Sequence, residues 1–235
     1  MPGKNKLQRF AEMKDFKNTV EPKLKEIKGV TGEEKFKPHP MKGKWKNDFF
    51  QNPNPLVLEL GCGKGEYSVG LGRKFPQKNF LGVDIKGARI YVGAKTALDE
   101  GLSNVGFLRT RIDFIDLFFE TGEVDEIWIT FPDPQLRKNR IRKRLTGKLF
   151  TDRYKKFLKP GGIIHLKTDN TTLYEYTLEE IEEHGFELVY ETDNLYEKGI
   201  THFDEDVREI LGIKTHYETL FSEQGFNIKY IKFKL

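Results

Sequence analysis

From Leu56 onward, strand-sized apolar stretches alternate with stretches of helical length, and this alternation limits the possible folds more than any other feature. Strands separated by helices of roughly 10–15 residues are typical of a parallel sheet with right-handed crossovers. The sequence therefore predicts a doubly wound α/β domain over residues 51–235. The expected strands are 56–60, 79–85, 104–111, 124–131, 162–169, 186–192 and 226–235.

Residues 1–50 differ in composition from the rest of the chain. They contain 13 Lys and Arg against 7 Asp and Glu, whereas the other 185 residues contain 27 against 29. Mixed charge, prolines and the lack of a sustained hydrophobic period predict an extended basic N-terminal arm with one short helix. Lysine-rich termini are often only solvated, but gathered positive charge also suits a polyanionic partner.

The sequence disfavours membrane, secreted and metal-dependent classes of protein. No apolar stretch approaches the roughly 20 residues of a membrane-spanning helix, and the N-terminal residues lack the apolar centre of a secretory signal. Cys62 is the single cysteine and cannot form an internal disulfide, and the five histidines show no metal-ligand spacing. We therefore expect a cytoplasmic protein that binds no membrane and no metal.

Four acidic residues lie at or just beyond the carboxyl end of an expected strand: Glu59, Asp84, Asp133 and Asp169. In open parallel sheets, ligands bind at this edge. One carboxylate there could arise by chance, but four favour a shared cleft.

The segment ELGCGKG (59–65) joins the first strand to a helix and is rich in glycine. Gly61, Gly63 and Gly65 have the spacing G-x-G-x-G, whereas the dinucleotide fingerprint G-x-G-x-x-G would need its last glycine one position later. The carboxylate of Glu59 would repel a pyrophosphate but attract a ligand that carries an ammonium and a sulfonium group.

Asp84 lies 23 residues after Gly61, where a carboxylate can accept both hydroxyls of a ribose. The glycine loop and its two acids therefore predict S-adenosylmethionine as the cofactor, and no G-x-x-x-x-G-K-[ST] loop is present to hold a nucleoside triphosphate. A tight turn without a ligand is the simpler alternative. Cys62 is expected to be a small packing residue and not a nucleophile.

The stretch TFPDPQLRKNRIRKRL (130–145) holds Asp133 between Pro132 and Pro134 and then places six basic residues within Arg137–Arg144. The prolines restrict the backbone around the aspartate, which fits a carboxylate kept in a fixed place. The simpler interpretation is a turn-forming aspartate that pairs with nearby arginines.

Together these motifs resemble those of the bacterial tRNA (guanine-N7-)-methyltransferases. The resemblance rests on LELGCGKG, LGVDI, FPDP before a basic run, KTDN and KTHYE, and it covers about residues 55–220. It implies a Rossmann-like class I S-adenosylmethionine-dependent methyltransferase, with a seven-stranded, mostly parallel sheet whose last strand is antiparallel. It also implies methyl transfer to N7 of a guanosine in the variable loop of tRNA.

By position in these motifs, the resemblance implies roles for individual residues. The cofactor would be bound by Glu59, Gly61, Gly63, Asp84, Arg111 and Asp133, of which Asp133 would also be catalytic. The substrate would be bound by Arg137, Asp169, Thr215 and Glu218. Phosphates of the RNA backbone would be contacted by the remaining cations of the basic run, namely Lys138, Arg140, Arg142, Lys143 and Arg144.

Three positions depart from the usual pattern of that family. Gln135 replaces a Trp, Arg137 replaces a Lys, and Arg111 stands where the family has an acid or amide. Arg137 keeps the charge but adds a planar fork, so the two residue types are not equivalent. Adenine would be held either by backbone groups at Arg111 or by Asp113, and we favour the backbone.

Guanine N7 carries an exposed lone pair and no proton, so its methylation requires alignment and not a general base. The methylated base is cationic, and a rigid carboxylate such as that of Asp133 would stabilise the growing charge.

Other interpretations stay open. FPDPQ is near the D-P-P-[YF] pattern of enzymes that methylate an exocyclic amino group of RNA or DNA, and a non-catalytic RNA-binding module on this fold is a further alternative. Asp169 could cap the following helix, and Thr215 with Glu218 could form a capping box. His165 lies within an apolar strand and is expected to be a core residue.

Overall fold

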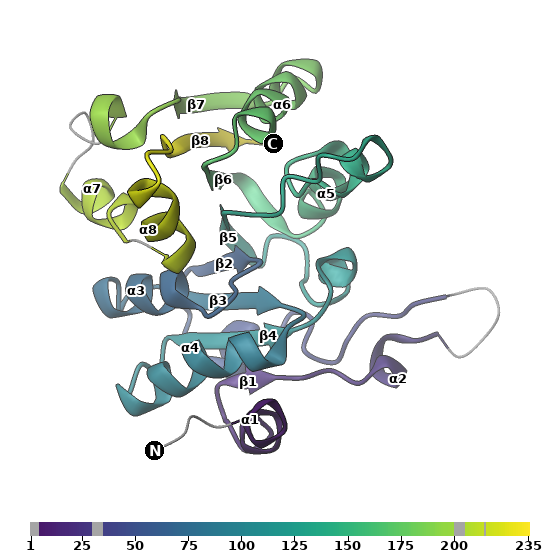
Figure 1. Ribbon diagram of the computed structural model, residues 1–235. Coiled ribbons are helices and arrows are strands. Elements are labelled where there is room, and N and C mark those ends of the chain that lie inside the picture. The colour runs from purple at the N-terminus through teal and green to yellow at the C-terminus, as the bar shows by residue number, and fades with distance from the viewer. Residues whose placement is uncertain (1–4, 30–34, 200–204, 214) are drawn as a thin grey trace.

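The computed structural model describes residues 5–29, 35–199, 205–213 and 215–235. One sheet of eight strands runs in the order β1-β4-β3-β2-β5-β6-β8-β7, from the bottom to the top of Figure 1. The strands are β1 (Thr19–Val20), β2 (Leu56–Leu60), β3 (Asn79–Asp84), β4 (Val105–Arg109), β5 (Val124–Thr130), β6 (Leu158–Thr168), β7 (Glu187–Thr192) and β8 (Lys229–Lys234).

Neighbouring strands are parallel from β1 to β6, whereas β8 is antiparallel to both β6 and β7. The predicted fold class is confirmed: the sheet is mostly parallel and its last strand is reversed. The count of seven strands is corrected to eight, because the two-residue β1 pairs with the edge of β4. A strand this short has no hydrophobic period, so nothing in the sequence pattern marks it.

Helices alternate with the central strands, as predicted. They are α1 (Lys6–Met13), α2 (Leu24–Ile27), α3 (Glu66–Lys74), α4 (Gly87–Asp99), α5 (Lys148–Tyr154), α6 (Thr171–Glu183), α7 (Glu205–Leu211) and α8 (His216–Glu223). In the described residues the chain also forms tighter or wider helical turns, namely η1 (Trp45–Phe49), η2 (Ile112–Leu117), η3 (Lys138–Lys143) and η4 (Leu195–Gly199). Within the described residues, none of the helices combines the length and apolar character that crossing a membrane requires.

Alternation along β2 divides its side chains between the two faces of the sheet. Leu56, Leu58 and Leu60 pack into an apolar cluster shared with α5 and α6, whereas Val57 packs into a cluster shared with α3 and α7. Because successive side chains of a strand point to opposite faces, Glu59 lies on the same face as Val57. The acid that precedes the glycine loop is thereby directed toward α3.

The described part of residues 1–50 differs from the expected extended arm. α1 packs on α4, with Met13 buried between them, and β1 extends the sheet. Trp45 is fully buried, and its Nε1 donates to the carbonyl oxygen of Phe118 at 2.8 Å. These apolar residues are irregularly spaced, so only the partners that they meet from distant parts of the chain show that they belong to the core.

His165 is a core residue, as predicted. Its ring stacks on Trp128 at a centroid separation of 3.8 Å, and its Nδ1 lies 2.7 Å from the hydroxyl of Tyr230. Burial lowers the pKa of His165, because the protonated ring would lose its hydration.

Candidate active site

The carboxyl ends of β2, β3 and β5 open onto a cleft of about 540 Å³. Small-molecule sites typically have volumes of roughly 300–1,000 Å³. A hollow of about 380 Å³ adjoins the cleft and shares Gly61, Asp84 and Gln135 with it. Glu59 and Asp133 also line the cleft. The structure therefore brings together three of the four predicted strand-end acids.

The glycine loop is built from left-handed backbone conformations. Gly61 has φ 81° and Gly63 has φ 55°, and a Cβ added to either would meet no atom within 4 Å. Gly65 is the N-cap of α3 with φ 71°, and a Cβ there would lie 2.5 Å from the ring of Phe107. The first two glycines leave the backbone open to a ligand, and the third lets α3 begin close against the sheet.

Glu59 is buried at the base of the cleft with 3% of its surface exposed. Its Oε2 accepts hydrogen bonds from the backbone N (2.9 Å) and Oγ (2.5 Å) of Ser68, and its Oε1 accepts one from Oγ1 of Thr130 (2.9 Å). Burial raises the pKa of Glu59 to about 7, although these donors oppose the shift. A buried carboxylate held by neutral donors is suited to a cationic ligand.

Asp84 fixes the glycine loop to the end of β3. Its Oδ2 accepts from the backbone N of Gly63 at 3.0 Å, and its Oδ1 accepts from the backbone N of Lys86 at 2.8 Å. Each carboxylate oxygen has more than one acceptor position, so the half-buried group can hold the loop and still accept from a ligand hydroxyl.

Asp133 lies in a turn after β5 whose backbone is strained on both sides. Phe131 has φ 47° and Gln135 has φ 48°, which are uncommon values for residues with side chains. Oδ1 of the exposed Asp133 accepts from the backbone N of Gln135 at 3.0 Å, which forms an Asx turn. Strain of this kind gathers at functional sites, and here it flanks a carboxylate on the cleft.

Arg144 supports this turn from within the protein. Its side chain is buried, its Nε donates to the carbonyl oxygen of Pro134 at 2.9 Å, and its guanidinium carbon lies 4.3 Å from the ring centre of Tyr176. The expectation that Arg144 contacts RNA phosphates is therefore corrected. A buried guanidinium that already bonds the Asp133 turn and stacks on an aromatic ring is not presented to a polyanion.

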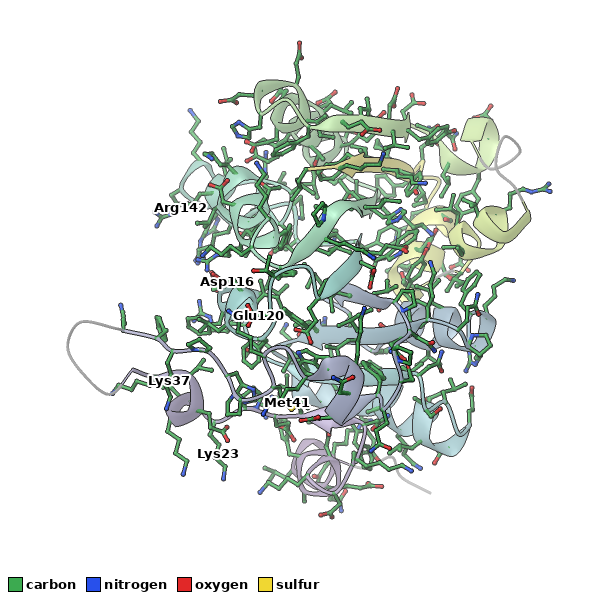
Figure 2. All side chains as sticks on the ribbon, turned by 180° about the vertical axis from the view of Figure 1, so that it is seen from behind. Lys23, Lys37, Met41, Asp116, Glu120 and Arg142 are labelled. Atoms are coloured by element: carbon green, nitrogen blue, oxygen red, sulfur yellow. The ribbon has the colours of Figure 1, made fainter. Side chains whose placement is uncertain are left out.

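The other cations of the basic run lie at the surface. Arg137, Lys138, Arg140 and Arg142 are exposed, and Lys143 is half-buried and lines the cleft. Figure 2 shows Arg142 at the periphery of the molecule. Their contacts with RNA stay a prediction.

Arg111 and Asp113 act as a pair. Nε and Nη2 of Arg111 lie 3.1 and 2.9 Å from Oδ2 of Asp113, and both residues line the hollow beside the cleft. Ile112 between them lines both spaces. Which of these residues contacts the adenine stays a prediction.

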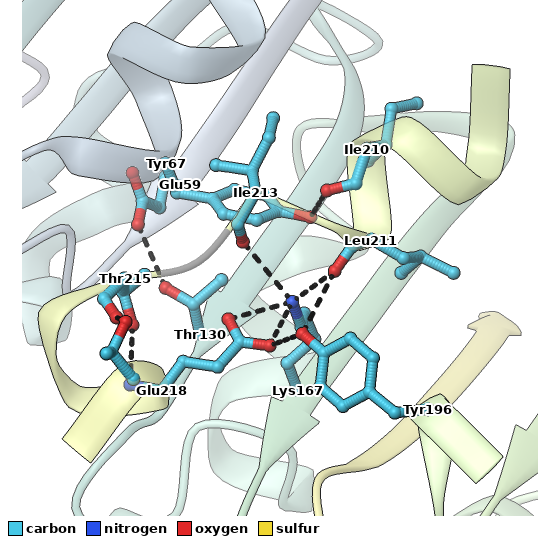
Figure 3. Close-up of polar contacts among 11 residues, drawn as sticks. Glu59, Tyr67, Thr130, Lys167, Tyr196, Ile210, Leu211, Ile213, Thr215 and Glu218 are labelled. Carbon is cyan, nitrogen blue, oxygen red and sulfur yellow. Dashed lines mark hydrogen bonds and ion pairs between the residues drawn. The ribbon is translucent and has the colours of Figure 1, made fainter. Parts of the chain in front are cut away.

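Thr215 and Glu218 are brought to different places. Thr215 lines the cleft and caps α8, because its hydroxyl accepts from the backbone N of Glu218 at 3.1 Å. The Glu218 carboxylate is completely buried and lies 2.7 Å from Nζ of Lys167. Figure 3 shows the carboxylate turned toward the ammonium. The expectation that Glu218 binds substrate is therefore corrected, because in this structure a buried cation on β6 neutralises it.

Asp169 follows β6 and is not among the described residues that line the cleft. Its carbonyl oxygen accepts from Nζ of Lys229 at 3.0 Å. The capping role falls on the next residue, because Oδ1 of Asn170 accepts from the backbone N of Leu173 at 2.9 Å. A substrate contact by Asp169 stays a prediction.

The sequence did not identify Ser68 and Thr130, which donate hydrogen bonds to the carboxylate of Glu59. It also did not identify Lys167, which forms an ion pair with Glu218. Thr130 and Lys167 directly precede FPDP and TDN, so their places at strand ends were a usable signal. Ser68 lies nine residues after Glu59. Its contact with that acid depends on the path of the glycine loop, and no local pattern marks it.

We assign no chemical role to Cys62 or to a group of possible metal ligands at the end of α6. Cys62 is buried, and burial raises the pKa of its thiol, which suits a packing residue. On α6, Glu180, Glu183 and His184 place possible metal-ligand atoms within 4.8 Å of one another. Glu180 already accepts from the backbone N of Lys148 at 2.7 Å, and exposed acidic groups of this kind are common without an ion.

The likeness to solved structures concerns the fold alone. The 16S rRNA methyltransferase KamB has a TM-score of 0.56 at 14% identity, covering 77% of this chain and 88% of that chain. The 30S ribosomal A1408 methyltransferase from an uncultured bacterium has a TM-score of 0.55 at 14% identity, covering 88% and 98%.

Sequence comparison is more specific. Residues 53–230 match the family model described as "Putative methyltransferase". A tRNA (guanine-N(7)-)-methyltransferase of Bacteroides fragilis is 51% identical over 233 residues, which are 99% of this chain and 86% of the relative. The protein of the same name from Christiangramia forsetii is 48% identical over 235 residues, which are all of both chains. With the glycine loop and three of the strand-end acids in one cleft, these matches show that the chain belongs to the tRNA (guanine-N(7)-)-methyltransferase family.

Proposed function

We propose that this protein transfers a methyl group from S-adenosylmethionine to N7 of a guanosine in the variable loop of tRNA. The observation that carries the proposal is a single cleft lined by the buried Glu59 and the exposed Asp133, with exposed cations in the turn that follows. Relatives named tRNA (guanine-N(7)-)-methyltransferase are identical to this chain at about half of the aligned positions. A cytoplasmic location is part of the proposal and is supported by the nature of the tRNA substrate.

The residues of the cleft fit S-adenosylmethionine. The pKa of Glu59, raised to about 7 by burial, marks a carboxylate that a ligand ammonium would stabilise. The open backbone at Gly61 and Gly63 allows close approach, and Asp84 can accept ribose hydroxyls. When bound, this cofactor supplies a methyl group on a positively charged sulfur.

Asp133 is placed to hold the guanine. Its carboxylate can accept hydrogen bonds from N1–H and the exocyclic amine while its Oδ1 stays anchored to Gln135. As N7 takes the methyl group, the bond from the methyl carbon to the cofactor sulfur would break and leave its electron pair on the sulfur. The positive charge would pass to the purine, where a fixed carboxylate stabilises it. No residue has to remove a proton, because N7 carries none.

The exposed cations of the basic turn would hold the tRNA by its phosphates, which fixes position without reading the sequence. Two lysines of the N-terminal region, Lys23 and Lys37, lie toward the same edge of the view as Arg142 in Figure 2.

Labelled methyl transfer to tRNA, followed by identification of the modified nucleoside, tests the proposal. We expect 7-methylguanosine from wild-type tRNA and none from a transcript that lacks the variable-loop guanosine. A methylated exocyclic amine would instead support an amino-methyltransferase. Binding of tRNA without binding of S-adenosylmethionine in calorimetry would support a non-catalytic RNA-binding module.

Neutralising the exposed cations of the basic turn is expected to weaken tRNA binding and flatten its salt dependence. Each phosphate contact that is lost reduces the slope of log K against log salt by about 1, so Arg140→Gln with Arg142→Gln should reduce it by about 2. Filter binding at several salt concentrations measures the slope.

The matched control removes two cations from α3 and α4, through Arg73→Gln with Lys95→Gln. Arg73 is exposed and Lys95 is half-buried, and they are ion-paired to Glu100 and Asp99. We expect this control to leave the slope unchanged. Equal slopes in the two double variants would show that the basic turn is not the RNA contact.

A further inference from the structure

Lys167 is a completely buried lysine in β6, and its ammonium is surrounded by acceptors from the C-terminal part of the chain. Nζ lies 2.7 Å from Oε1 of Glu218 and donates to the carbonyl oxygen of Leu211 at 2.8 Å. The hydroxyl of Tyr196 also donates to Glu218. Figure 3 shows these groups converging on the ammonium. A lysine is almost never fully buried unless it is paired, so this arrangement is specific.

The groups that Lys167 binds belong to the segment that carries α7 and α8. A second contact fixes the same segment, because the hydroxyl of Tyr67 on α3 donates to the carbonyl oxygen of Ile210 at 2.9 Å. Thr215, between the two helices, lines the cleft beside Glu59 and Thr130. The segment therefore supplies Thr215 to the lining of the cofactor cleft.

The backbone of Lys167 is hydrogen-bonded to the start of the Asp133 turn, which also lines the cleft. Lys167 pairs with Thr130 in the register of β5 and β6, and its carbonyl oxygen accepts from the backbone N of Phe131 at 2.8 Å. Phe131 is the left-handed residue that begins the Asp133 turn. One residue thus connects the strand end that presents Asp133 with the segment that presents Thr215.

We propose that Lys167 is a positioning residue that, through Glu218, holds the α7–α8 segment against β6 and so keeps Thr215 in place as a wall of the cofactor cleft. The inference rests on the proposed function for the identity of the cofactor. It assigns to Glu218, the last residue of the T-x-x-E motif, a structural role: this residue anchors the segment that carries Thr215. Contact with the substrate is not part of that role.

The ion pair of Lys167 and Glu218 should affect cofactor binding because each buried charge becomes unfavourable when its partner is removed. Removing the ammonium leaves a buried carboxylate without its cation, and removing the carboxylate leaves a buried ammonium. A carboxylate that loses its cation must either take up a proton or move toward water. In the second case Thr215 would move with Glu218, because it caps α8. Removing both charges together leaves no unpaired charge in the interior, so the segment has no electrostatic reason to move.

Lys167→Met tests the proposal directly. We expect its dissociation constant for S-adenosylhomocysteine, measured by calorimetry, to rise by about tenfold or more. Amide hydrogens of α8 should exchange faster while those of β2 and β3 keep their protection. At saturating S-adenosylmethionine, kcat should stay within about threefold of wild type, because the pair does not touch the reacting atoms.

Three further variants keep the test independent of a folding defect. Gly70→Ala places a Cβ 2.8 Å from Cγ2 of Ile213, so it should displace the same segment without changing charge and raise the same constant. Lys167→Met with Glu218→Gln should bind better than Lys167→Met alone. Lys148→Met breaks an exposed pair with Asp152 and should change nothing.

Normal affinity for S-adenosylhomocysteine in Lys167→Met, with α8 exchanging faster, would overturn the proposal, because the segment would then not be a wall of the site. An equal loss in the single and double variants would also overturn it. Failure of the proposed function is distinguishable: wild type would yield no 7-methylguanosine in tRNA, whereas the affinity and exchange comparisons would be unaffected.

Discussion

Replacing Asp133 with alanine is expected to lower kcat for methyl transfer to tRNA by about 10²–10³-fold, while affinity for S-adenosylhomocysteine stays within about threefold. The carboxylate lies at the mouth of the cleft in a turn whose backbone is strained at Phe131 and Gln135. Its charge is worth most as the purine becomes cationic, so the loss should fall on the chemical step. Single-turnover transfer to tRNA measures it.

Asp133→Asn separates charge from turn geometry. Its amide oxygen can still accept from the backbone N of Gln135 and preserve the Asx turn, but it carries no negative charge. We expect a loss in kcat close to that of Asp133→Ala. Near-normal turnover in the asparagine variant would mean that Asp133 only shapes the turn. Asp99→Ala, on the exposed face of α4, is the control for removal of an acid.

Glu59→Gln is expected to raise the dissociation constant for S-adenosylmethionine at pH 8 by about 10- to 100-fold, because the ligand ammonium loses its counter-charge. Glutamine can keep the bonds to Ser68 and Thr130, so the loop should remain in place. Calorimetry measures the constant. Unchanged affinity would remove Glu59 from cofactor binding.

The raised pKa of Glu59 also predicts how the free energy of unfolding depends on pH, and the direction of the pKa shift fixes the sign. Its pKa is 4.5 in the unfolded chain and about 7 in the folded one, so between these values the folded state holds a proton that the unfolded state has lost. The free energy of unfolding of the ligand-free protein should therefore fall as pH rises from 4.5 to 7, by about 3 kcal/mol.

Glu59→Gln should remove this component of the pH dependence in urea unfolding series. In the wild type near pH 6.5, binding of the cationic cofactor should release up to one proton, which calorimetry in buffers of different ionisation enthalpy detects. Release of the same number of protons by Glu59→Gln would contradict the assignment of the titrating group to Glu59.

Much of the fold could be predicted because the central strands are marked locally. Short apolar runs such as LVLEL, followed by turn residues, identify the central buried strands. The edge strand β1 and the buried Trp45 could not be predicted, because two residues form no period and a lone tryptophan shows no partner. Their places depend on β4 and on Phe118, many residues away.

The candidate site could also be predicted only in part. The acids at strand ends follow from topology, since parallel strands end at one edge, and Glu59, Asp84 and Asp133 meet there as the pattern predicts. Arg142 and Arg144 lie two residues apart in one basic run, yet the first is exposed and the second is buried. Nothing in the run distinguishes them, because the difference is made by Tyr176 on α6 and by the carbonyl oxygen of Pro134.

The sequence by itself determined the alternation of the central strands and helices, the glycine loop and the acids at the sheet edge, since these depend on neighbours within a few residues. Only the tertiary structure decided which charges face solvent and which are neutralised inside, as for Arg144 and the Lys167–Glu218 pair. The physical reason is that the cost of burying a charge depends on partners that folding brings from elsewhere in the chain.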